Sequence, residues 1–185
     1  GDTLHPGDVY ATCPETPIIT HKCMVPPQLY GTVKAVKPSG AYKVNDTVVT
    51  ITDEDGLDHD LTLCQQWPIR TPRPVASRKY ADAPLITGQR VIDTLFPLAK
   101  GGTAAIPGGF GTGKTMTQHQ LAKWCDADII VYIGCGERGN EMSQVLEEFS
   151  ELVDPKSGRP MTDRTCLIAN TSNMPVAARE ASIYT

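Results

Sequence analysis

The sequence of 185 residues has no apolar run long enough to cross a bilayer and no charged-then-apolar leader. It also has no basic half. Its net charge is −4, with 9 acidic against 7 basic residues up to Arg78 and 12 against 10 after it. Aromatic residues make up only 6% of the chain. These deficits argue against a membrane-spanning protein and against a surface that binds nucleic acid by charge and base stacking.

The chain also lacks paired cysteines. None of its six cysteines stands at C-x-x-C spacing, which excludes the common zinc and thioredoxin-like motifs. We expect them to be buried, reduced thiols of a protein in a reducing compartment. They are Cys13, Cys23, Cys64, Cys125, Cys135 and Cys166.

The first part of the chain, residues 1–78, is rich in Pro, Gly and Thr and is predicted to be a small β-rich domain. Strands are predicted at 31–36, 47–52 and 61–64, and Asp55-Gly56 is a hairpin signal between the last two. The acidic residues around that turn do not fit a calcium loop, so a solvated hairpin tip is expected. Three prolines within residues 67–74 favour an extended connector, and we place a domain boundary there.

The second part, residues 79–185, alternates predicted strands and helices, which indicates an α/β fold with a parallel sheet. We expect a short buried strand at 103–106, helix 114–125, strand 129–133, strand 166–169, and a helix from Pro175 to Thr185. Apolar residues at i, i+3, i+4 and i+7 predict one more helix with a buried stripe. That stripe consists of Met142, Val145, Leu146 and Phe149.

The octapeptide GGFGTGKT matches the phosphate-binding pattern G-x-x-x-x-G-K-[ST] at every fixed position. Three glycines are expected to adopt positive φ and to let the backbone approach an anion: Gly108, Gly111 and Gly113. Lys114 is predicted to reach the β- and γ-phosphates of a nucleotide, and the Thr115 hydroxyl to ligate Mg²⁺. The nucleotide-binding residues are therefore predicted to be Gly108, Gly109, Phe110, Gly111, Thr112, Gly113, Lys114 and Thr115. ATP or ADP with Mg²⁺ is the expected ligand.

A second group of polar residues follows the strand predicted at 129–133. Hydrolysis of a nucleoside triphosphate needs a carboxylate or amide to orient water and positive charge for the developing oxygens. Glu137 is predicted to fill the first role. Arg138 fills the second, or holds Glu137 through a salt bridge. Glu141 stands at a helix start, where the dipole favours a carboxylate, so we expect it to cap the helix.

At this point the chain resembles the catalytic A subunit of V-type and archaeal A-type rotary ATPases. Matching segments include PLITGQRVID (84–93), KGGTAAIP (100–107), QHQLAKW (118–124), GCGERGNEM (134–142) and IANTSNMPVAAREASIYT (168–185). The resemblance implies that residues 1–78 are a β-rich bulge and that 79–185 begin a RecA-like nucleotide-binding domain. It also implies that Glu137 is the carboxylate that positions water and that Arg138 lies beside the phosphates.

The resemblance further implies partners and a location. In this family, A and B subunits alternate in a hexamer that works with central and peripheral stalk subunits on the cytoplasmic face of a membrane. ATP hydrolysis or synthesis there is coupled to ion transport. The family's Mg²⁺-supporting aspartate and adenine pocket follow the position of Thr185, so we expect the present chain to be a fragment with little activity alone. Two alternatives stay open: a nucleotide-binding module for assembly that does not hydrolyse ATP, and a RecA-like motor acting on nucleic acid.

Overall fold

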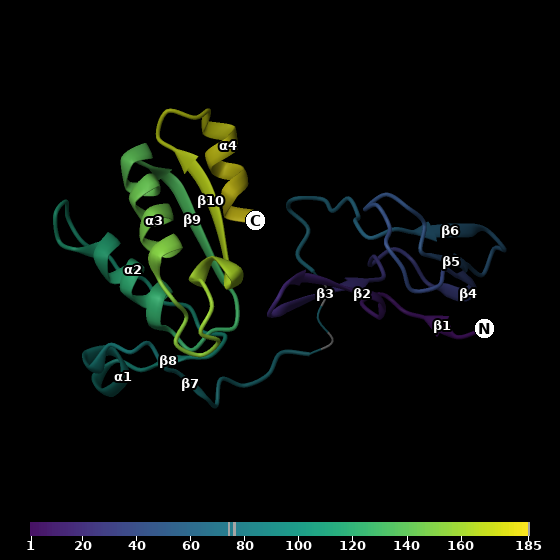
Figure 1. Cartoon of the computed structure of the whole chain (residues 1–185), viewed down its shortest axis with the longest axis horizontal. Coiled ribbons are helices and arrows are strands. Elements are labelled where there is room, and N and C mark those ends of the chain that lie inside the picture. The colour runs from purple at the N-terminus through teal and green to yellow at the C-terminus, as the bar shows by residue number, and fades with distance from the viewer. Residues whose placement is uncertain (74, 76, 185) are drawn as a thin grey trace. The chain divides into compact units, whose positions relative to one another are not determined.

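The computed structural model describes residues 1–73, 75 and 77–184, and it divides into two compact units, Gly1–Ala76 and Ser77–Thr185. Each unit has its own hydrophobic core. The elements of both units are labelled in Figure 1. We describe the two units separately.

The first unit is built from antiparallel strands. Four of them form one sheet in the order β1-β4-β5-β6, with bounds Thr3–Leu4, Gly31–Val36, Val49–Thr52 and Asp58–Leu61. A separate hairpin pairs β2 (Val9–Thr16) with β3 (Ile19–Met24). The core contains the alternate residues Val49 and Ile51 of β5 and Leu61 of β6, together with Val25 after β3 and Val48 before β5. The β-rich character predicted for this part of the chain is confirmed.

The hairpin predicted at Asp55-Gly56 joins β5 to β6, and Gly56 has a φ of 78°. Asp53 holds this turn: its Oδ1 accepts hydrogen bonds from the N–H groups of Asp55 (3.0 Å) and Leu57 (2.9 Å). Its Oδ2 lies 2.7 Å from His59 Nε2. The hydrogen bonds from His59 and then Leu57 lower the pKa of Asp53. The strand expected at 61–64 is wrong in position: β6 begins at Asp58, directly after this tight turn, and ends at Leu61, so residues 62–64 form no strand.

The proline-rich connector contains a turn, so the prediction that it is extended throughout is wrong. The Thr71 N–H donates to Pro68 O (3.0 Å), and Trp67 Nε1 donates to Thr71 O (2.6 Å). The guanidinium of Arg73 stacks 4.7 Å from the centre of the Trp67 ring. Pro74, the last residue of the predicted connector, lies outside the described residues.

The second unit begins with a small substructure that the sequence patterns did not indicate: β7 (Pro84–Leu85), α1 (Arg90–Leu95) and β8 (Leu98–Ala99). Its longer elements follow in alternation. They are α2 (Lys114–Trp124), β9 (Ile130–Glu137), α3 (Gly139–Glu151), the 3-10 turn η1 (Met161–Arg164), β10 (Thr165–Thr171), α4 (Val176–Ala181) and η2 (Ser182–Tyr184). Strands β9 and β10 pair in parallel from Thr165↔Ile130 onward. The alternation of strands and helices and the parallel pairing are as predicted.

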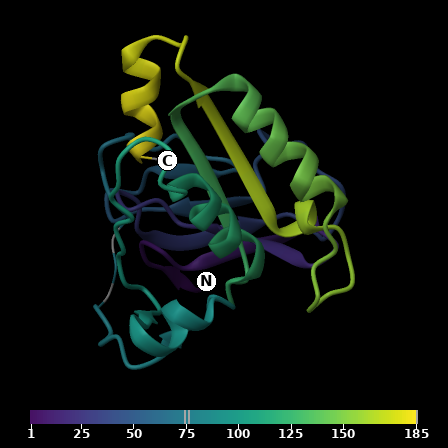
Figure 2. The same ribbon diagram turned by 90° about the vertical axis from the view of Figure 1, so that its left-hand side faces the viewer.

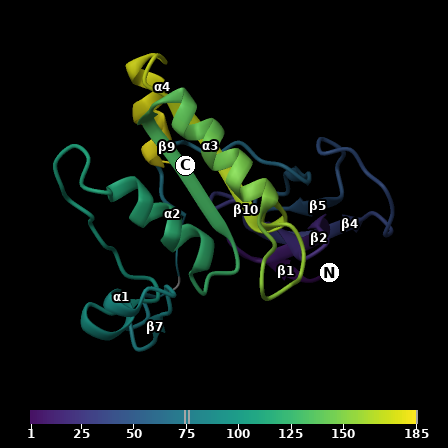
Figure 3. The ribbon, with the colours of Figure 1, turned by 60° about the vertical axis from the view of Figure 1, so that its left-hand side comes forward.

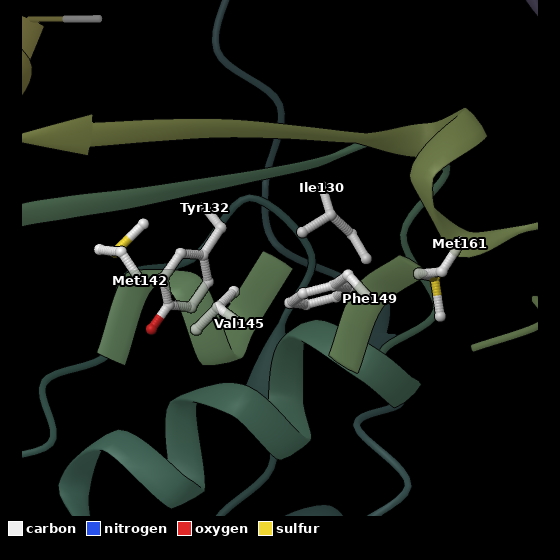
Figure 4. Close-up of a cluster of buried hydrophobic side chains, with 6 residues drawn as sticks. All are labelled: Ile130, Tyr132, Met142, Val145, Phe149 and Met161. Carbon is white, nitrogen blue, oxygen red and sulfur yellow. The ribbon is translucent and has the colours of Figure 1, made fainter. Parts of the chain in front are cut away.

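Helix α3 covers one face of the two parallel strands, and α4 lies near the ends of the same strands (Figure 2). Figure 3 shows α2 alongside β9. The hydrophobic core of the second unit is shown in Figure 4 and consists of Ile130, Tyr132, Met142, Val145, Phe149 and Met161. The ring of Phe149 is fully buried and lies 6.3 Å, centre to centre, from the ring of Tyr132.

Two predictions about burial and strand content are wrong. Leu146 is 55% exposed because, within the described part of the unit, no element packs against its side of α3. Residues 103–106 form no strand, since none of the described strands pairs with them. Along β9 alternate residues are the most buried and Val131 is 54% exposed, because successive side chains of a strand point to opposite faces and only one face of β9 is well covered.

The thiols also differ from expectation. All six cysteines are free, as predicted, but only Cys23 is buried. The others are partly or fully exposed. Among the described residues, no helix combines the length and the apolar character needed to span a membrane.

Candidate functional site

The glycine-rich octapeptide forms the loop before α2 and ends in the first turn of that helix. Gly113 is the residue preceding the helix and has φ 82° and ψ 16°, a left-handed conformation that only glycine adopts without cost. Gly111 also has positive φ (76°). This backbone turns the chain sharply into α2, whose free N–H groups point toward the loop. The predicted positive φ is confirmed at these two positions.

Gly108 does not have positive φ, so that part of the prediction is wrong. Its role is to allow close approach: a Cβ at this position would lie 2.5 Å from Thr112 Oγ1. Thr112 in turn donates a hydrogen bond to Gly109 O (2.8 Å). The turn is therefore compact because residue 108 has no side chain.

The Lys114 ammonium folds back over this loop. Its Nζ donates to the carbonyl oxygens of Gly108 (2.6 Å) and Gly109 (2.5 Å). Both acceptors are neutral, so a phosphate oxygen would be a stronger partner for the same cation. Lys114 is thus held at the loop by two neutral acceptors, which an anion could replace.

The second group of residues lies at the carboxyl end of β9. Gly134 allows the strand to pass close to α3, because a Cβ there would clash with Met142 Sδ. Gly136 has φ 80° and turns the backbone immediately before Glu137, the last residue of the strand. The Glu137 carbonyl is fixed by the Ser172 N–H (2.9 Å), which anchors the turn to the chain following β10.

The loop and the end of β9 enclose one cavity of about 540 Å³. Its lining includes Phe110, the run from Gly111 to Met116, Gly136, Glu137, Arg138 and Glu141. Lys114, Thr115, Glu137 and Arg138, all predicted as site residues, thus meet at one place. Ligands of parallel α/β sheets bind at the carboxyl ends of the strands, and this cavity has that position.

Glu141 has a role that the sequence analysis did not foresee. It lies in the first turn of α3, as expected for a residue that interacts with the helix dipole, but its carboxyl also lies beside that of Glu137. The hydrogen bond that protonated Glu137 can make to Glu141, burial and the negative charge of Glu141 together raise the pKa of Glu137. Glu137 and Glu141 are four residues apart at the start of α3, and this spacing is the sequence signal that could have predicted their interaction.

The Arg138 guanidinium lies over the face of the Phe110 ring, 5.5 Å from its centre. This contact joins the residue after β9 to the phosphate-binding loop. The alternative role as an ion-pair partner of Glu137 is not seen: no ion pair of Arg138 occurs among the described residues. A cation–π contact leaves the charge available to an anion in the cavity.

The site offers little to a metal ion by itself. Within the ranges that the structure describes, no three His, Cys, Asp or Glu side chains gather as a metal cluster. Thr115 contributes a hydroxyl to the cavity lining. One hydroxyl beside a phosphate site fits Mg²⁺, which keeps several waters and takes most of its other ligands from substrate phosphates.

Comparison with known protein families agrees with this arrangement. Residues 88–185 match the model of the nucleotide-binding domain of the ATP synthase alpha/beta family, and residues 1–70 match its barrel-sandwich domain. The chain belongs to the ATP synthase alpha/beta family. The resemblance to V-type and A-type ATPases and the predicted pairing of a β-rich domain with a partial α/β domain are confirmed.

Individual relatives of this ATP synthase alpha/beta chain are similar over all 185 residues. The V-type ATP synthase alpha chain of Halothermothrix orenii is 64% identical, and the A subunit of the A-type ATP synthase of Methanopyrus kandleri is 62% identical. The chain spans 31% of the length of each of these relatives. Among solved structures, an ATPase from the type III secretion system of pathogenic bacteria matches with a TM-score of 0.50 and 26% identity. That match covers 68% of this chain and 34% of the other.

Proposed function

We propose that the cavity of about 540 Å³ binds the phosphates of ATP or ADP, and that the chain is part of the catalytic subunit of a V-type or A-type rotary ATPase. One observation carries the proposal: the loop bearing Lys114 and the carboxylate of Glu137 line the same cavity. Phosphate binding alone would need only the loop. A carboxylate facing it supplies the group that hydrolysis requires.

In this proposal the phosphates replace the loop carbonyls as partners of Lys114. The N–H groups of the loop and of the first turn of α2 bind phosphate oxygens, and the positive end of the helix dipole favours their charge. The Thr115 hydroxyl would hold Mg²⁺, which supplies positive charge to the phosphates.

Glu137 orients the attacking water and accepts its proton. Its raised pKa makes the carboxylate a better proton acceptor than an ordinary glutamate. Arg138, held against Phe110 at the rim, stabilises the charge that develops on the transferred phosphoryl group. In synthesis the same groups act in reverse order.

The proposal extends to the assembly. Residues 1–78 form the β-rich domain, and residues 79–185 form the amino-terminal part of the nucleotide-binding domain. The longer protein would alternate with B subunits and contact central and peripheral stalk subunits at the cytoplasmic face of a membrane. Its ATP turnover would drive, or be driven by, the movement of protons or sodium ions. The names of the relatives support this assignment.

The test is ATP hydrolysis by the full-length protein reconstituted with its partner subunits. Glu137→Gln keeps the size of the side chain and removes the base, so we expect turnover to fall by about 100-fold or more while nucleotide binding persists. Glu147→Gln is the matched control because Glu147 is an exposed glutamate of α3 that does not line the cavity. Turnover by Glu137→Gln equal to that of the control would refute the proposed role.

A further inference from the structure

Two cysteines lie close together in the first unit, far along the sequence from the nucleotide cavity. Cys13 belongs to β2, where it stands opposite His21, and Cys23 belongs to β3, where it stands opposite Ala11. Side chains alternate along a strand, so residues two apart share a face. Cys13 and Cys23 are therefore diagonal neighbours on the same face of this hairpin.

The two thiols differ in accessibility. Cys23 is only 4% exposed, and burial, followed by the neighbouring Cys13 thiol, raises its pKa. Cys13 is partly exposed and lines a second cavity, of about 460 Å³, together with Tyr10, Lys37 and Tyr42. Cys13 is therefore the accessible thiol of the pair, and Cys23, which does not line the cavity, is the buried one.

An accessible thiol backed by a buried one is the arrangement that dithiol–disulfide exchange requires. The accessible thiolate attacks an external disulfide, and the buried thiol then resolves the mixed disulfide. The ammonium of Lys37 in the same cavity favours an anionic reagent. Cys64, by contrast, donates its S–H to Asn45 Oδ1 (3.2 Å) and does not line this cavity.

We propose that Cys13 and Cys23 form a redox-active dithiol that small anionic disulfides oxidise. The Cys13 thiolate attacks one sulfur of the reagent, forms a mixed disulfide and releases one thiol. Cys23 loses its proton to solvent and its sulfur attacks the Cys13 sulfur, releasing the second thiol. The protein dithiol is oxidised by two electrons, and one molecule of disulfide is reduced to two thiols.

Oxidation would tie the two strands of the hairpin and close the loop of residues 14–22. The Cβ atoms of diagonal neighbours stand farther apart than the roughly 3.5–4.5 Å of a disulfide, so the strands must shift toward each other. A disulfide that forms only after such a shift is strained, and a strained disulfide is more readily reduced than an unstrained one. The pair is therefore expected to be reversible.

The experiment incubates the 185-residue chain with oxidised glutathione and maps disulfides by mass spectrometry of unreduced peptides. We expect the Cys13–Cys23 linkage to dominate and to disappear with dithiothreitol. Cys23→Ser should leave glutathione attached to Cys13, and Cys64→Ser, the matched control, should behave as the unaltered chain. Stable glutathione on Cys13 in the unaltered chain, a linkage of either residue to Cys64, or no reaction at all would each overturn the proposal.

Discussion

Two adjacent positions of α3 provide a direct test of the second core. Val145 is 1% exposed and packs among Tyr132, Phe149 and Met161, whereas Leu146 is 55% exposed. The apolar pattern of the helix predicts both as core residues, but the structure buries only the first. Truncating each to alanine should therefore give very different losses of stability.

The expected loss follows from burial. Val145→Ala removes two methyl groups, worth about 1.6 kcal/mol at about 0.8 kcal/mol per buried group. A residual cavity adds about 24 cal/mol per Å³, so the total loss in the free energy of unfolding should be about 2–3 kcal/mol. Leu146→Ala removes a larger side chain from a surface site and should change stability by no more than about 0.5 kcal/mol.

Urea unfolding of the 185-residue chain measures both variants. Trp124, at the end of α2, reports on the second unit, and Trp67→Phe removes the signal of the first unit from every sample. With a slope of about 1.5 kcal/mol per molar urea, Val145→Ala should lower the midpoint by about 1.3–2 M. Equal losses for the two variants, or a larger loss for Leu146→Ala, would refute the assignment of the buried face of α3.

Three further predictions concern other sites of the second unit. Gly134→Ala places a methyl group against Met142 Sδ and should lower the free energy of unfolding by about 1–3 kcal/mol in the same urea assay, and an unchanged midpoint would contradict the close packing. Burial lowers the pKa of His119, so folding favours the neutral ring and the free energy of unfolding should decline as the pH falls below about 6.5. His119→Phe should flatten that decline when unfolding is measured between pH 8 and 5. If the variant declines as steeply as the unaltered chain, another group causes the pH dependence. Lys114→Met should weaken binding of ATP to the isolated chain by at least about 10-fold, as followed by Trp124 fluorescence, and unchanged affinity would remove the lysine from the site.

The sequence patterns predicted the local structure of the second unit well where the physical signal is local. The glycines and lysine of the phosphate-binding loop determine a turn into a helix, and the apolar run before Glu137 determines a strand; both are present. Residues 103–106 are also predicted as a strand, yet they form none because a strand needs a hydrogen-bonding partner. Pairing partners are a property of the whole sheet, which local patterns do not contain.

The sequence predicted which residues form the candidate site more completely than it predicted the contacts among them. The sequence predicted Lys114 and Glu137 at the same end of the sheet, and both residues line one cavity there. The contact of Arg138 with Phe110 and the effect of Glu141 on the pKa of Glu137 depend on side-chain directions that no spacing rule specifies. The exposure of Leu146 has the same origin, since a wide apolar stripe does not say how much of it a neighbour covers.

The single partner of β9 has a consequence for handling the chain. One edge of the strand presents free N–H and C=O groups among the described residues, next to the exposed side chains of Ile129 and Val131. Such an edge is a template on which a strand from another copy can add. Self-association through this edge requires two copies of the chain, so dilution should oppose it. A short peptide that pairs with β9 should suppress aggregation at a concentration that leaves the fold intact.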